Sequence, residues 1–177
     1  MDLMHSREFS EITVQDLLDR AGVGRATFYS HFRSKDDFLF TDLERMLASL
    51  ESHFDRTSER TTRVAPVGEL FEHLKEVRGF AEALERSGHM EAVLDIASGH
   101  FARIIERRLK TLDAEPRELP LGAAARVFGA MAMELGKWWL SRPTPLSARD
   151  MDDRFHELVW RGLSDGRATP SRTSSTR

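Results

Sequence analysis

Between positions 20 and 35 the chain carries four basic side chains and no acidic one, although its first 60 residues hold 12 acidic and 8 basic residues. The basic residues are Arg20, Arg25, Arg33 and Lys35, and side chains with hydroxyl and imidazole groups lie between them. A positive window inside an acidic region is the charge distribution that binding to a phosphate backbone favours. The chemistry expected of this segment is therefore electrostatic and hydrogen-bonded recognition of DNA.

Two short helices around a tight turn are expected to present this window. Thr13 can cap the first helix through its hydroxyl, with Asp16 three residues later in the position of a capping box. Gly22 allows the positive φ that a tight turn between helices requires. Phe28 and Phe32 lie four residues apart, so they share one face of the second helix and are expected to face inward. The pattern indicates a helix-turn-helix whose outer face is free for DNA.

The same segment resembles the N-terminal signature of the tetracycline-repressor (TetR) family over residues 12–14, 21–23, 27–32 and 34–39. The resemblance implies contacts to base edges from Arg25, Ala26 and Thr27. It implies phosphate contacts from Thr13, Tyr29, His31 and Lys35. The full set expected to contact DNA is Thr13, Arg25, Ala26, Thr27, Tyr29, Ser30, His31 and Lys35.

The segment departs from the family pattern in two places. Gly24 stands where the family usually has a serine that caps the recognition helix, and this exchange costs only a few tenths of a kcal/mol. The family's first helix is normally longer before this point, and here only Leu3, Met4 and Phe9 remain to cover the helix-turn-helix. We therefore expect the natural chain to begin upstream of Met1.

The rest of the chain is expected to be helical, because no stretch alternates between apolar and polar residues with a period of two. Apolar residues recur at helical spacing between Gly and Pro, and the expected helices are 14–20, 25–31, 35–56, 70–84, 90–109, 121–140 and 148–163. We expect an all-α fold with three parts. These are a helix-turn-helix head at 1–42, an antiparallel helical effector-binding and dimerisation body at 43–165, and a disordered tail at 166–177.

The segment 121–140 is unusual because only Arg126 is polar between positions 121 and 133. A helix that is apolar all round is buried on every side, so one face is expected to meet the core and the other a second copy of the chain. Gly129 and Ala132 would allow that copy to approach closely. The expected dimer interface consists of Phe128, Gly129, Ala132, Leu135, Phe155, Leu158 and Val159.

A small-molecule effector is expected to bind in the body, with plain core packing as the equal alternative. The residues expected to line its pocket are Phe71, Leu74, Phe101, Phe128 and Trp138. His73, His89 and His100 could meet as ligands, although separate histidines are the more common arrangement.

These features predict an effector-responsive repressor that binds palindromic operator DNA as a homodimer. An effector that prefers a state with different head spacing would lower operator affinity. Two alternatives stay open. One is a dimeric helical ligand-binding protein whose DNA-binding head is impaired by its short first helix, and the other is an all-α enzyme that uses the body cavity.

Other classes of protein are disfavoured by the composition. The chain has no cysteine, which excludes disulfides, thiolate zinc sites and thiol catalysis. No run approaches the roughly 18 consecutive apolar residues of a membrane span, and residues 1–10 lack the apolar region of a secretory signal. No catalytic constellation is recognisable. We expect a cytoplasmic protein that is not an enzyme and has no cofactor, metal or membrane partner.

Overall fold

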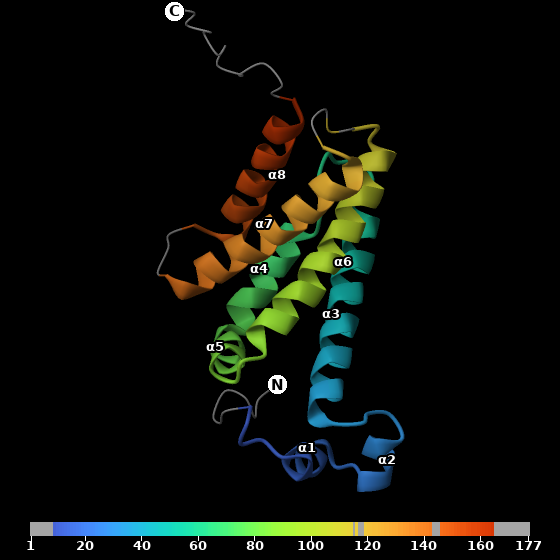
Figure 1. Cartoon of the computed structure of the whole chain (residues 1–177), viewed down its shortest axis with the longest axis vertical. Helices are drawn as coiled ribbons and strands as arrows, with labels where there is room; N and C mark the ends of the chain where they lie inside the picture. Colours follow the sequence, from blue (N-terminus) through green and yellow to red (C-terminus); the bar gives the residue numbers. More distant parts are fainter. Residues whose placement is uncertain (1–8, 115, 117–118, 143–145, 165–177) are drawn as a thin grey trace, which may run out of the picture.

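The structure, a computed structural model, describes residues 9–114, 116, 119–142 and 146–164. The expected tail at 166–177 and the residues Leu3 and Met4 lie outside this part of the chain. The described residues are helical, without strands, as expected (Figure 1). The helices are α1 (Val14–Ala21), α2 (Arg25–Tyr29), α3 (Lys35–Ser58), α4 (Val67–Glu76), α5 (Arg78–Arg86), α6 (Met90–Thr111), α7 (Leu121–Ser141) and α8 (Ala148–Ser164).

The head and the body share one continuous helix. In Figure 1, α1 and α2 lie at one end of the molecule, and α3 runs from them along the whole body beside α6. The boundary expected at residue 42 therefore falls inside α3.

Among the described residues, no helix combines the length and the apolar character needed to cross a membrane.

The stretch 70–84, expected as one helix, is two helices that meet at Val77. Val77 has φ −107° and ψ 21°, outside the helical region, and it ends α4 and precedes α5. The bend turns α5 so that Ala83 and Leu84 pack against Phe9 and Leu39 near the head. The apolar spacing continues through the bend because both helices bury a face, so the sequence pattern could not reveal it.

The core of the body lies between α6 and α7 and extends to α4 and α8. Gly129 brings α7 against α6, because a Cβ at this position would lie 2.6 Å from the carbonyl oxygen of Ser98 and 3.0 Å from the nitrogen of Ala102. Phe71, Phe101 and Phe155 are fully buried in this core. Any larger residue at Gly129 would push the two helices apart.

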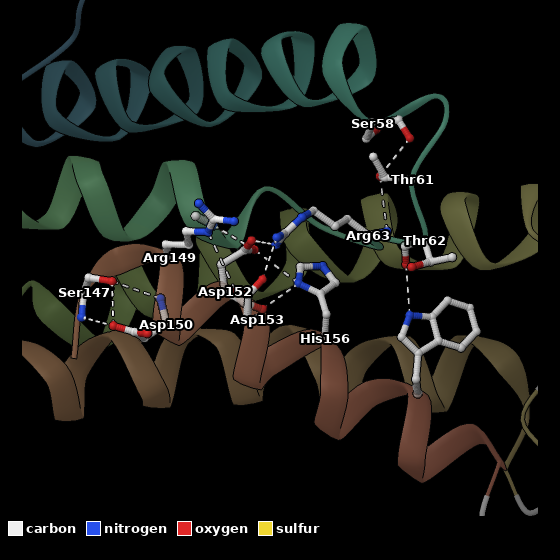
Figure 2. Close-up of polar contacts among 12 residues, drawn as sticks. Ser58, Thr61, Thr62, Arg63, Ser147, Arg149, Asp150, Asp152, Asp153 and His156 are labelled. Atoms are coloured by element: carbon white, nitrogen blue, oxygen red, sulfur yellow. Dashed lines mark hydrogen bonds and ion pairs between the residues drawn. The ribbon is translucent and has the colours of Figure 1, made fainter.

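A cluster of charged side chains joins the α3–α4 connection to α8 (Figure 2). Arg63 forms ion pairs with Asp152 and with Asp153, the latter over 2.7 Å. Asp152 also accepts a hydrogen bond of 3.1 Å from the backbone N–H of Gly68, in the first turn of α4. His156 donates through Nδ1 to the Asp152 carbonyl over 2.7 Å. The buried carboxylate of Asp152 therefore has hydrogen-bond and ion-pair partners where the α3–α4 connection meets α8.

His156 is held uncharged in this cluster. Burial, and next the positive charge of Arg63, lower the pKa of His156 to about 4. Its Nε2 atom is buried without a hydrogen-bond partner among the described residues. An unfolded histidine takes up a proton near pH 6.5, so acid favours unfolding. The contribution of His156 to stability is fully present above pH 6.5 and is lost as the pH falls toward 4.

We therefore predict that the wild-type chain loses about 2 kcal/mol more unfolding free energy than His156→Gln between pH 7 and pH 5. Glutamine cannot titrate and keeps a donor for the Asp152 carbonyl. The measurement is urea unfolding at both pH values, with the exposed His53→Gln as the matched control. Equal losses in wild type and His156→Gln would contradict the assignment.

Candidate DNA-binding interface

The first helix of the head begins with the expected capping box. The Thr13 hydroxyl accepts the Asp16 N–H over 3.2 Å, and the Asp16 carboxylate accepts the Thr13 N–H over 2.7 Å. The helix ends at Gly22, whose φ of 64° lies in the left-handed region that glycine adopts without strain. The next helix begins after Gly24, which provides no side-chain cap. The local signals in the sequence therefore predicted this turn correctly.

The second helix is shorter than expected, since it ends at Tyr29 and leaves His31 beyond it. Phe28 is buried beneath it, against Phe32 and Phe38 with ring centroids 5.3 and 6.3 Å away. Apart from Lys35, all the residues expected to contact DNA are exposed: Thr13, Arg25, Ala26, Thr27, Tyr29, Ser30 and His31. Tyr29 is 52% exposed, which leaves its phenol accessible.

Two of these exposed residues have neighbours that the sequence did not indicate. The Arg25 guanidinium donates to the side chain of Gln15 in α1 over 3.2 Å. The Ser30 hydroxyl donates back to the Thr27 carbonyl over 2.7 Å, at the end of α2. Gln15 was not among the expected site residues, and its place as an exposed polar residue in the first turn of α1 is the signal that could have found it.

Lys35 has a different environment from the one expected. Its ammonium donates to the carbonyl oxygens of Phe9, Ser10 and Ile12 over 2.6, 3.2 and 3.0 Å. It also lies 4.6 Å from the centroid of the Phe9 ring. An ammonium has three hydrogens to donate, so all of them have acceptors here. Lys35 therefore ties the segment before α1 to the start of α3 in the chain without DNA, and its expected phosphate contact stays a prediction.

The body contains a cavity of about 460 Å³ between α3, α4, α5, α6 and α7. Leu74 and Trp138 line it, as expected for an effector pocket. Phe71 and Phe101 do not, because they are fully buried in the core. Phe128 is also outside it and lies near Gly162 of α8. The walls are mainly aliphatic side chains and methionines from the five helices.

Four of the seven residues expected at a dimer interface face the interior of the chain. Gly129, Ala132, Phe155 and Val159 are buried in one copy, so they cannot contact a second one. Phe128 and Leu135 are half-buried, and Leu158 is 50% exposed. The exposed apolar surface of α7 and α8 instead includes Val127, 55% exposed, and Trp138, 40% exposed. Four of the expected interface residues therefore lie on inward-facing sides of α7 and α8, and a dimer interface on these two helices stays a prediction.

The three histidines of the body do not meet. His89 lies 3.2 Å from Asp36 at the start of α3. His100 pairs with Glu51 over 3.0 Å, between α6 and α3, and burial lowers its pKa. Burial also lowers the pKa of His73, which lines the cavity. Each histidine therefore has its own surroundings, and they do not form a common ligand set.

A helix-turn-helix carried on a helical body defines a DNA-binding regulator of transcription. Residues 1–41 match the bacterial regulatory proteins of the tetR family. The HTH-type transcriptional regulator EthR of Mycobacterium tuberculosis is 30% identical over an alignment of 177 positions. This alignment covers 90% of this chain and 80% of that relative. EthR of Mycolicibacterium smegmatis is 37% identical over 57 residues, 32% of this chain and 26% of that relative. The chain belongs to the TetR family of transcriptional regulators, which are not enzymes.

Solved structures show the same fold. The dihydroxyacetone kinase operon activator DhaS superimposes with a TM-score of 0.67 at 16% identity, over 92% of this chain and 90% of DhaS. A TetR transcriptional regulator from Streptococcus agalactiae gives a TM-score of 0.62 at 22% identity, over 89% and 87% of the two chains.

The Lys35 contacts generate a prediction about the head. Lys35→Met keeps an aliphatic stem against Phe9 but leaves three carbonyls without their donor. We expect it to destabilise the head by about 2–3 kcal/mol, since a hydrogen bond to a charged group contributes about 1.5–3 kcal/mol and these are only partly buried. Amide exchange of residues 14–29 should accelerate, whereas exchange in α6 should not change.

The matched control is Lys110→Met, which removes a lysine paired with Glu106 on the surface of α6. If Lys35→Met leaves exchange in the head unchanged and flattens the salt dependence of DNA binding, Lys35 contacts phosphate after all.

Proposed function

We propose that this chain is an effector-responsive repressor that binds a palindromic operator as a homodimer in the bacterial cytoplasm. The observation that carries the proposal is the division of α2 into two sides. Arg25, Thr27 and Tyr29 are exposed, while Phe28 is buried beneath them against the head. The exposed side offers a guanidinium, a hydroxyl and a phenol, which are groups that bind base edges and phosphates.

The geometry of DNA supports the proposed dimer. Two recognition helices that enter successive major grooves must lie about 34 Å apart, and a two-fold pair of heads matches a palindrome. The exposed apolar residues Val127 and Trp138 lie eleven positions apart on α7, or three helical turns, and so share one face. Leu158 on α8 lies one turn from Gly162, which neighbours Phe128 of α7. The exposed apolar residues of α7 and α8 are the proposed dimer surface, because an isologous two-fold is the commonest assembly.

Regulation would act through the cavity. A volume of about 460 Å³ suits a small molecule, and the aliphatic walls favour an apolar one. Phe80, Leu84, Met90 and Val93 line this cavity and also pack in the cluster that contains Phe9 and Ile12 of the head. A ligand that moves these shared walls would change the head's position, and would release DNA if it prefers the state with the wrong spacing.

The first test selects an operator from a random DNA library with the wild-type chain, and then compares affinities for that operator and for random DNA. We expect Arg25→Ala to reduce operator discrimination by about 1–3 kcal/mol per contact, because the fork of arginine reads guanine in the major groove. Fluorescence anisotropy at fixed salt measures both affinities. Arg56→Ala, an exposed arginine at the far end of α3, is the matched control.

If the selection enriches no sequence, the repressor proposal fails, and a helical ligand-binding protein with an impaired head is the remaining interpretation. If it enriches a sequence that Arg25→Ala reads equally well, the role of Arg25 is wrong while DNA binding stands.

The dimer surface has its own test. We expect Leu158→Arg to raise the dimer dissociation constant at least about 100-fold, because burying unpaired charges costs several kcal/mol and the two arginines would repel. Light scattering should then give the mass of one chain, and operator binding should weaken in parallel. Ala48→Arg, at an exposed position of α3, serves as control. Dimers that persist with both Leu158→Arg and Val127→Arg would contradict the proposed surface.

A further inference from the structure

A chain of side-chain hydrogen bonds joins α1 to the first residue of α2. Asp19 accepts from the Gln15 amide nitrogen over 2.8 Å. The Gln15 amide oxygen in turn accepts from Nη2 of Arg25 over 3.2 Å. Asp19 and Gln15 lie one helical turn apart in α1, and Arg25 opens α2. This chain of hydrogen bonds from Asp19 through Gln15 to Arg25, hereafter the relay, therefore spans the turn of the helix-turn-helix.

Each member of this relay can face only one way. A guanidinium only donates and a carboxylate only accepts. The Gln15 amide must therefore turn its oxygen to Arg25 and its nitrogen to Asp19, and the reversed amide would lose both hydrogen bonds. The Asp19 carboxylate thus selects the amide orientation that gives Arg25 an acceptor.

The relay is poorly suited to stabilising the fold. All three side chains are exposed, and hydrogen bonds and charges in water contribute little to folding. Asp19 also places a negative charge beside the basic window, where it would repel phosphate. Neither stability nor general affinity for DNA therefore explains why Asp19 and Gln15 hold Arg25.

We propose that Gln15, oriented by Asp19, is a positioning residue that determines how well Arg25 discriminates between bases. The inference rests on the proposed DNA-binding function. Arginine has five N–H donors, and one nitrogen bound by Gln15 leaves the others free for a base edge. Holding a long side chain in place before binding removes the cost of ordering it in the complex. The gain in affinity is limited to DNA that places a matching base within reach of the guanidinium held by Gln15. The ratio of operator affinity to random-DNA affinity therefore rises.

The test uses the full chain and the operator that the wild-type chain selects from random DNA. Gln15→Ala should lower the operator-to-random affinity ratio about tenfold for a dimer, or about threefold for each protomer, the size of one side chain's ordering cost. The salt dependence of binding and the melting temperature should stay at wild-type values, because no phosphate contact or buried group is lost. In an Arg25→Ala background, Gln15→Ala should have no further effect on the ratio.

Asp19 provides the matched pair of variants. Asp19→Asn removes the charge but keeps an acceptor for Gln15, so affinity for all DNA should rise while the ratio stays at the wild-type value. Asp19→Ala removes the acceptor as well, so the ratio should fall as it does in Gln15→Ala.

Three results would overturn the inference. The ratio could be unchanged in Gln15→Ala although the wild type discriminates between sequences. The effects of Gln15→Ala and Arg25→Ala could add fully, which would make Gln15 a direct contact to DNA. Asp19→Asn could lose as much discrimination as Asp19→Ala. A wild-type chain that selects no operator would instead overturn the proposed function itself.

Discussion

The position of the exposed side chains of α1 and α2 depends on the ammonium of Lys35. The head has a very small core, made of the buried side chains Phe9, Ile12, Leu18, Phe28 and Leu39. Burial of so few apolar groups gives limited stability. The three carbonyls bound by Lys35 precede α1, and Lys35 is itself the first residue of α3. One side chain therefore connects the start of the helix-turn-helix to the helix that continues into the body.

The bend at Val77 brings the wall of the body cavity into contact with the head. If residues 70–84 formed one straight helix, its apolar face would lie entirely against the body. Because α5 turns away, Ala83 and Leu84 pack beside Phe9, while Phe80 and Leu84 also line the body cavity. A packed interior transmits displacement and does not absorb it. A cavity wall that also touches the head is a physical basis for linking a ligand to DNA affinity.

The composition of α7 reflects two opposite requirements. Gly129 and Ala132 face inward and let α7 lie against α6 at close range. Val127 and Trp138 face outward and remain apolar although they are partly exposed. A helix that served only the core would carry polar residues on its outer side. The exposed Glu134 lies between Val127 and Trp138 on the same side, so it is the two large apolar side chains, within a mixed surface, that favour a second copy.

The sequence by itself determined the helical class, the helix-turn-helix and most of the exposed residues of the head. The signals for them act over a few residues: the Thr13–Asp16 capping box, the left-handed Gly22 and the pairing of Phe28 with Phe32. Resemblance to a family added expected roles for single residues, and these roles stay predictions. Helix periodicity also identified α7 and α8 as the helices with an apolar surface to cover.

Only the tertiary structure decided which partner each side chain meets. The acceptors of Lys35 lie 23 to 26 residues away along the chain, and Gln15 lies ten residues from Arg25. Periodicity says which residues share a face but not what covers that face. For this reason Gly129, Ala132, Phe155 and Val159 were expected at a partner and are buried in the chain's own core. The bend at Val77 was hidden for the same reason, because an apolar pattern is unchanged when its two halves pack against different neighbours.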